Sequence, residues 1–263
     1  MIALAAAAEG GYEAPGVADF WQPLIGDGAF AITRPIFVFG ISAILLCIVL
    51  VRATRNLSVV PGKGQALLEA SYSLVRNSIG RDIIGAKDFI KFIPLLFSLF
   101  TVILVNNLFG IIPVVQYPTM SRIGFPIALA LVVYVVYHFL GARKHGVGGW
   151  IKRISIPPDV PGFVLPLLIL LELNTYFIVR PVTLALRLFG NMFAGHILLL
   201  LFILGGEYLV FESGSIGLAG AGLVTWLMAF VMTCFELLVQ FLQAYIFTLL
   251  AALYIADALA DEH

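Results

Sequence analysis

The sequence is poor in charged residues and in cysteine. Only 11% of its 263 residues are charged, against about 25% in soluble domains. Because 15 Lys and Arg balance 15 Asp and Glu, nucleic-acid binding driven by bulk charge is excluded. The two cysteines, Cys47 and Cys234, lie far apart in apolar runs, so they indicate neither a disulfide framework nor a zinc site.

Long apolar runs take up most of the chain. Hydrophobic residues make up 61% of it and its mean hydropathy is +1.06, which predicts an integral membrane protein. A spanning helix needs about 20 apolar residues. The predicted membrane segments are 35–51, a helical hairpin over 92–141, 162–206 and 216–257. Together they make five transmembrane helices in an all-α fold.

The last two membrane segments are longer than a bilayer requires. Residues 216–256 carry one charge, and as a helix they would extend about 60 Å, twice the thickness of a hydrocarbon core of about 30 Å. After Gly222 no Gly, Pro or Asn could turn this chain back. We therefore expect two steeply tilted, antiparallel helices, 162–206 and 216–257.

The basic residues predict the orientation in the membrane. Eleven of the 15 Lys and Arg fall within 52–91 and 142–153, which places these segments in the cytoplasm. The spacing of apolar residues from Gln65 to Ile79 predicts an interfacial amphipathic helix. The remaining predicted segments are an outer-side N-terminal segment 1–34, a cytoplasmic segment 52–91, a cytoplasmic loop 142–161, an outer connector 207–215 and a cytoplasmic tail 258–263.

Several polar residues interrupt the apolar runs, where charges are costly and therefore mark candidate functional sites. Arg187 is the most informative, because a guanidinium group stays protonated and acts as a fixed positive charge. Arg180, beside Pro181, is interpreted as a snorkelling or kink residue. The other ionisable residues are Glu172, His196 and Glu236, and the amides are Asn191, Gln240 and Gln243. Asn106 and Asn107 are interpreted as packing residues near a helix end.

Three pairs of these residues fit one register of an antiparallel helix pair. The pairs are Arg187 with Gln243, Asn191 with Gln240, and His196 with Glu236. Their residue numbers add up to 430, 431 and 432, so they would form one polar seam. His196 and Glu236 are its titratable members, and water, imidazole and carboxylate could carry protons along it. Structural hydrogen bonding between the helices remains an alternative.

Helical geometry separates two roles in this region. On an ideal helix, at about 100° per residue, His196 points about 180° away from Arg187. Arg187 would then face a partner outside the chain, whereas His196 would face the neighbouring helix. Gly190 and Gly195 are expected to permit close helix approach.

The run from Arg180 to His196 resembles the signature of the a subunit of F-type ATP synthases. The resemblance also covers 236–247, 106–113 and the Val60-Pro61 pair with Glu69. It implies that Arg187 is the stator arginine facing the carboxylates of the c-subunit ring. The outer half-channel residues that it implies are Asn191, His196, Glu236, Gln240 and Gln243. Glu172 is the candidate for the cytoplasmic half-channel.

The same resemblance implies the setting of the chain. Its partners would be the c-subunit ring, peripheral-stalk b subunits, other ATP synthase subunits, the lipid bilayer and protons, with no nucleic acid. The chain would lie in the bacterial plasma (inner) membrane with its N-terminus outside and its C-terminus in the cytoplasm. It would need no cofactor, metal or nucleotide and would not be catalytic alone.

Two departures from the family pattern stand out. Many bacterial relatives carry Glu at the position of His196 and His at that of Glu236. Glu172 falls one residue off the usual spacing from Arg187.

Two other classes of protein are weaker interpretations. An autonomous ion channel or secondary transporter would need its own substrate site, usually within inverted repeats, and no repeat is visible. An intramembrane hydrolase would need a nucleophile and base or metal ligands, but the sequence has no HExxH motif, and residues 214–217 form a connector.

Overall fold

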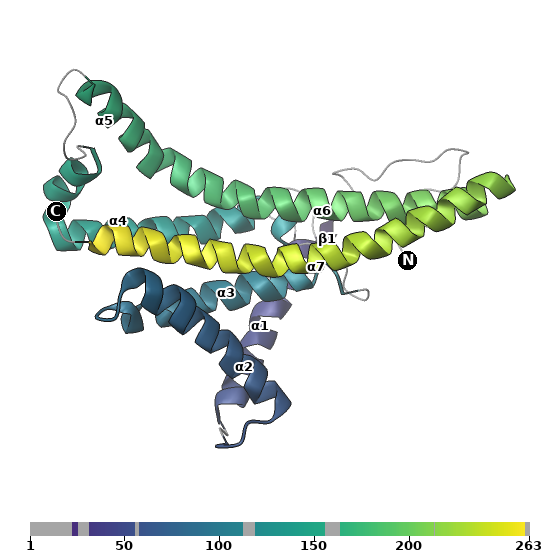
Figure 1. Ribbon diagram of the computed structural model, residues 1–263, viewed down its shortest axis with the longest axis horizontal. Helices are drawn as coiled ribbons and strands as arrows, with labels where there is room; N and C mark the ends of the chain where they lie inside the picture. Colours follow the sequence, from purple (N-terminus) through teal and green to yellow (C-terminus); the bar gives the residue numbers. More distant parts are fainter. Residues whose placement is uncertain are drawn as a thin grey trace.

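Two very long antiparallel helices, α6 and α7, organise the molecule, and the shorter helices pack along part of their length (Figure 1). The computed structural model describes residues 23–25, 32–55, 58–112, 119–155, 164–212 and 214–260. Most of the predicted outer segment 1–34 and the last tail residues, 261–263, lie outside the described residues.

The described chain is almost entirely helical. The elements are β1 (Pro23–Ile25), β2 (Ile32–Thr33), α1 (Arg34–Arg55), α2 (Lys63–Ser73), the π-helix η3 (Leu74–Ile84), the 3₁₀-helix η4 (Phe89–Lys91), α3 (Ile93–Leu108), the 3₁₀-helix η5 (Thr119–Ser121), α4 (Gly124–Ser155), α5 (Leu165–Asn174), the π-helix η6 (Thr175–Val179), α6 (Arg180–Phe211) and α7 (Ile216–Leu259). The short antiparallel pair β1 and β2, which the sequence did not predict, precedes the first helix.

Four described helices are long and apolar enough to cross a membrane. They are Arg34–Arg55, Gly124–Ser155, the continuous helix Leu165–Phe211 and Ile216–Leu259. A fifth apolar helix, Ile93–Leu108, is shorter. The length and composition of these helices fit a membrane protein. Within the predicted hairpin 92–141, the first helix ends at Leu108, because the backbone after it tightens into turns in which Gly110 N donates to Asn107 O at 3.0 Å.

Helices α6 and α7 lie side by side because small residues let their backbones approach. A Cβ on Gly222 would lie 2.9 Å from the carbonyl oxygen of Gly206, so only glycine fits there. Trp226 Nε1 donates to Ile203 O at 3.3 Å in the same register. Helix α6 runs to Phe211, so the first part of the predicted connector 207–215 is helical.

The helix that contains Arg187 is bent. In the π-helix η6 the backbone pairs five residues apart, and Arg180 N donates to Thr175 O. The next donor in that register would be the N–H of residue 181, which proline lacks. Tyr137 Oη on α4 supplies a donor instead, at 2.7 Å from Tyr176 O. Beyond this point α5 diverges from α7 (Figure 1).

The predicted cytoplasmic loop 142–161 is also largely helical. Helix α4 continues to Ser155, with a kink at Gly146, whose φ of +74° favours glycine. The kink folds the last turns back, so that Trp150 Nε1 donates to His138 Nδ1 at 3.0 Å. The basic residues of this segment therefore lie on a helix rather than on a loop.

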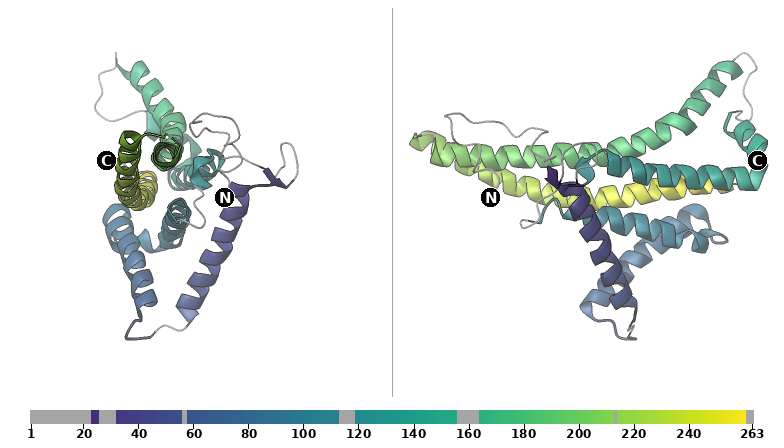
Figure 2. Two further views of the ribbon diagram at one scale, coloured as in Figure 1. Left: turned by 90° about the vertical axis from the view of Figure 1, so that its right-hand side faces the viewer. Right: turned by 180° about the vertical axis from the view of Figure 1, so that it is seen from behind.

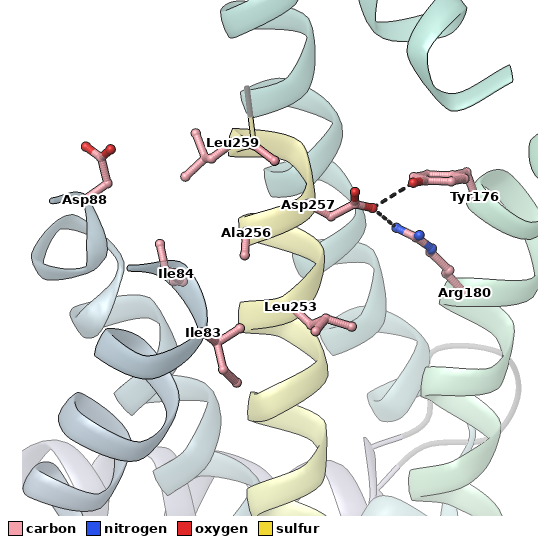
Figure 3. Close-up of a pocket in the computed structure, with 10 residues that line it drawn as sticks. Ile83, Ile84, Asp88, Tyr176, Arg180, Leu253, Ala256, Asp257 and Leu259 are labelled. Carbon is pink, nitrogen blue, oxygen red and sulfur yellow. Dashed lines mark hydrogen bonds and ion pairs between the residues drawn. The ribbon is translucent and has the colours of Figure 1, made fainter. Parts of the chain in front are cut away.

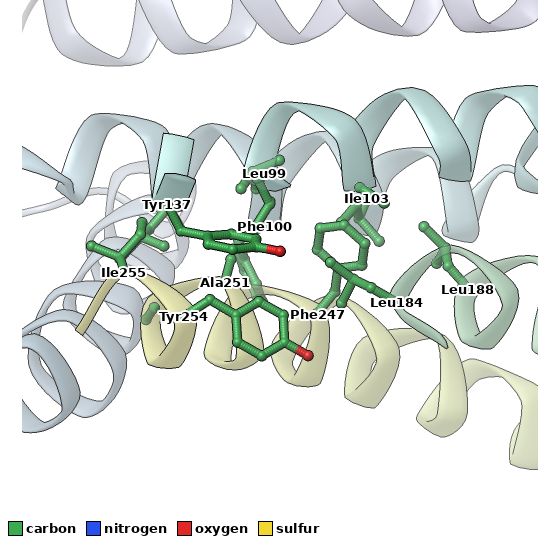
Figure 4. Close-up of a cluster of buried hydrophobic side chains, with 14 of the residues drawn as sticks. Leu99, Phe100, Ile103, Tyr137, Leu184, Leu188, Phe247, Ala251, Tyr254 and Ile255 are labelled. Carbon is green, nitrogen blue, oxygen red and sulfur yellow. The ribbon is translucent and has the colours of Figure 1, made fainter. Parts of the chain in front are cut away.

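The core joins α3, α4, α6 and α7 (Figure 4). Four alanines of α7 are fully buried and allow bulky residues of the other helices to pack closely; they are Ala244, Ala251, Ala252 and Ala258. The core residues labelled in Figure 4 are Leu99, Phe100, Ile103, Tyr137, Leu184, Leu188, Phe247, Ala251, Tyr254 and Ile255. This core packs the N-terminal turns of α6 against the C-terminal half of α7.

Candidate functional site

A buried polar cluster lies where α3, α6 and α7 meet. Gln240 on α7 is fully buried, and its Nε2 donates to Glu236 Oε1 at 3.3 Å and to Met192 Sδ at 3.8 Å. Asn107 Nδ2 on α3 donates to the main-chain oxygen of Gln240 at 3.3 Å. The cluster of Asn107, Met192, Glu236 and Gln240 therefore connects three helices.

Three acceptor atoms of this cluster have no hydrogen-bond partner among the described residues. They are Asn107 Oδ1, Glu236 Oε2 and Gln240 Oε1. Buried polar atoms normally find a partner, so each exception needs an explanation such as a water molecule or a chemical role. Three such acceptor atoms within one cluster indicate a site that can bind water or exchange a proton.

Helix α6 presents its small face to Glu236. A Cβ on Gly195 would lie 3.1 Å from Glu236 Oε1, so the absence of a side chain leaves room for the carboxyl group. His196, the next residue, is 3% exposed, as is Glu236. The predicted role of Gly195 in close helix approach is therefore confirmed. A Cβ on Gly190 would meet no atom of the described residues within 4 Å, so Gly190 makes no close helix contact within this part of the chain.

These contacts meet the residue-number sum predicted for facing positions of α6 and α7, although they join other residues than the three predicted pairs. Met192 with Gln240, and Gly195 with Glu236, have residue numbers that add up to 432 and 431. Asn191 and Gln243 are half-buried near the same level of the helix pair. Glu236 and Gln240, one turn apart on α7, are in direct contact. The other predicted seam residues lie on α6 and α7.

Arg187 lies on a different face of α6. It is exposed, whereas Leu184 and Leu188 on either side are buried in the core. Among the described residues it forms no ion pair, although it lies within electrostatic range of Tyr254. Helix α6 therefore presents a positive charge outward and buries His196 inward, as the helical geometry predicted.

Glu172 lies away from this cluster. It is half-buried on α5, which bends away from α7 beyond the π-helix η6. The bend arises from Pro181 and the π-helical backbone. The sequence indicated a kink beside Pro181 but not the direction that α5 takes. The structure brings Glu172 together with neither Arg187 nor Glu236.

A second polar group joins the other ends of α6 and α7 (Figure 3). Arg180 NH1 lies 2.8 Å from Asp257 Oδ2, and Tyr176 Oη donates to the same oxygen at 2.7 Å. These three residues line a cavity of about 610 Å³ together with Asp88. A hydrogen bond from Lys91, which lies outside the membrane helices, holds the pKa of Asp88 below its ordinary value.

Sequence reasoning missed two of these features. Asn107 and Asp257 both contact residues more than 70 positions away, Gln240 and Arg180, so no local pattern could pair them. A buried amide within an apolar run was the available signal for Asn107. In the described ranges, no three His, Cys, Asp or Glu side chains are grouped to hold a metal ion.

The fold and the site define a multi-spanning membrane protein that buries ionisable groups between its helices and exposes one arginine on a helix face. Comparison with known proteins makes the class specific. Residues 36–256 match the family described as ATP synthase A chain. The chain belongs to this family.

Individual relatives match over nearly the whole chain. The ATP synthase subunit a of a Nocardioides species is 47% identical over 97% of this chain and 96% of its own length. That of Pseudarthrobacter chlorophenolicus is 43% identical over the full length of both chains. That of Streptomyces lividans is 40% identical over 96% of this chain and 90% of its own.

Proposed function

We propose that this chain is the proton-translocating stator subunit of a rotary ATP synthase. The observation that carries the proposal is the division of α6 into two faces. Arg187 is exposed on one face without an ion pair among the described residues, and His196 is buried on another face beside the cluster of Glu236 and Gln240. One face suits a moving partner, and the other suits a path for protons.

Arg187 would act on carboxyl groups of a c-subunit ring. A carboxylate within about 4–6 Å of a guanidinium is held in its ionised form, whereas in lipid the neutral acid is favoured. Each ring carboxyl group would lose its proton as it approaches Arg187 and regain one before it re-enters the lipid. Because arginine cannot deprotonate, Arg187 would also block direct proton flow between the two half-channels.

The polar cluster would form part of the half-channel from the outer side. Its unpaired acceptors on Asn107, Glu236 and Gln240 are suited to bind water, and water between them could pass a proton. From His196 to Arg187 is nine residues, roughly 13 Å along the helix. Asn191 and Gln243, half-buried at the same level, would line the remainder.

The orientation in the membrane follows from the same picture. Figure 2, left, looks along α6 and α7, and α1 runs across that direction. With α1 spanning the bilayer, α6 and α7 lie obliquely and could follow a curved ring. We propose five membrane segments in the bacterial plasma membrane, with the N-terminus outside, the C-terminus in the cytoplasm, and peripheral-stalk b subunits among the partners. Glu172 would lie on the cytoplasmic side of Arg187.

ATP-driven proton pumping in inverted membrane vesicles tests the proposal. Each proton gains about 2.3 kcal/mol per 100 mV, and coupling requires that it cannot bypass the ring. We expect Arg187→Ala to abolish pumping and to let protons leak passively. Arg55→Ala, which removes an exposed arginine at the end of α1, is the matched control and should pump normally. Coupled pumping by Arg187→Ala would contradict the proposed function.

A further inference from the structure

Two arginines lie on one face of the same helix but in different surroundings. Arg180 and Arg187 are seven residues apart, about 20° short of two full helical turns and about 10 Å along the axis. Arg187 is exposed, whereas the side chain of Arg180 is only 19% exposed to solvent. Of the two, Arg180 forms an ion pair within the chain, with Asp257.

Arg180 is held from several directions (Figure 3). Its guanidinium binds Asp257 Oδ2 at 2.8 Å, and the guanidinium carbon lies 3.5 Å from the centre of the Tyr176 ring and 5.0 Å from that of the Tyr254 ring. Tyr176 Oη also binds Asp257, so the carboxylate is itself fixed. Aromatic faces attract cations, and a partly buried ion pair loses much of its outward field.

The backbone is built to place this group. The missing N–H of Pro181 and the π-helix η6 bend the chain, and Tyr137 Oη supports Tyr176 O at 2.7 Å. The bend carries the Tyr176 side chain to the end of α7, where Asp257 lies. The pairing of Arg180 with Asp257 therefore depends on a specific local conformation, not on chance contact of surface side chains.

We propose that Asp257 is a positioning residue that neutralises Arg180, so that Arg187 is the one uncompensated positive charge this helix face presents to the ring. This inference rests on the proposed function. A ring carboxylate must be attracted by Arg187 and must also leave it at every step. A second unpaired guanidinium about 10 Å away would hold the carboxylate longer and slow each step.

The test compares a single and a double substitution in the complete ATP synthase, in inverted vesicles. Asp257→Asn keeps the shape and a hydrogen-bond acceptor but leaves Arg180 unpaired. We expect the rate of ATP-driven pumping to fall roughly tenfold. This is the factor by which the attraction between the ring carboxylate and an unpaired guanidinium about 10 Å away, at an effective dielectric constant of about 20, would slow the departure of the carboxylate. Arg180→Gln combined with Asp257→Asn removes both charges and should restore most of the rate.

The alternatives give different results. If the ion pair only braces the bend, the double variant will pump as slowly as Asp257→Asn, and the inference fails. It also fails if Asp257→Asn pumps at the normal rate. If Asp257→Asn does not assemble, the double variant must still assemble and pump near the normal rate. Coupled pumping by Arg187→Ala would instead overturn the proposed function. If Arg187→Ala does not pump and the double variant pumps slowly, the proposed function stands and only this inference fails.

Discussion

Replacement of Gly195 by alanine tests whether the buried polar cluster conducts protons. The new methyl group would lie 3.1 Å from Glu236 Oε1 and 3.4 Å from Glu236 Cδ, so the carboxyl group must retreat by a few tenths of an ångström. Its hydrogen bond from Gln240 is already 3.3 Å long and would be stretched to the limit of such a bond. A hydrogen bond of this kind contributes about 1 kcal/mol.

We therefore expect Gly195→Ala to slow ATP-driven proton pumping about fivefold, the factor that ~1 kcal/mol represents. The variant should still assemble, because alanine favours the helix by about 1 kcal/mol over glycine. Gly220→Ala is the matched control, since it makes the same exchange on α7 where a Cβ meets no atom within 4 Å. Equal pumping by the two variants would refute a role for the position of the Glu236 carboxyl group.

Three further predictions concern the framework of the molecule. Gly146→Ala should lower the free energy of unfolding by about 1–3 kcal/mol, because the φ of +74° and ψ of 158° suit only glycine, and thermal unfolding in detergent measures this. Tyr137→Phe, which removes the donor to Tyr176 O, should cost about 0.5–1.5 kcal/mol in the same assay; an unchanged melting temperature would contradict the role given to that bond. Lys91→Met should raise the pKa of Asp88 toward its ordinary value of 3.8, as followed by carboxyl NMR shifts. Because folding lowers this pKa, the stabilisation is present above pH 3.8 and is lost as the pH falls through the lowered pKa.

The sequence predicted the register of α6 and α7 because that register follows from helical geometry. Residues of two antiparallel helices advance by the same 1.5 Å per position in opposite directions, so facing residues keep a constant sum of numbers. The contacts of Gln240 with Met192 and of Glu236 with Gly195 show that sum. No knowledge of the loops or of the partner subunits was needed.

The bends were not predictable in the same way. Pro181 indicated a kink near Arg180, but the direction of α5 depends on which neighbour supplies the missing donor, and that neighbour is Tyr137 on another helix. Gly146 falls within the segment 142–161, which the basic residues predicted as a cytoplasmic loop. Its kink is fixed by packing of Trp150 against Gly141, where an added Cβ would lie 2.4 Å from the indole.

The two arginines show how tertiary contacts give the same residue type two roles. From the sequence, Arg187 is interpreted as a fixed positive charge and Arg180, beside Pro181, as a snorkelling or kink residue, with no counter-ion assigned to either. The structure separates them, because Asp257 meets only Arg180 and leaves Arg187 exposed. In the proposed function, Arg187 is the single charge that the ring approaches and leaves, and Asp257 compensates the second arginine on that face. The bend at Pro181 makes that compensation possible, since it brings Tyr176 to the carboxylate that holds Arg180.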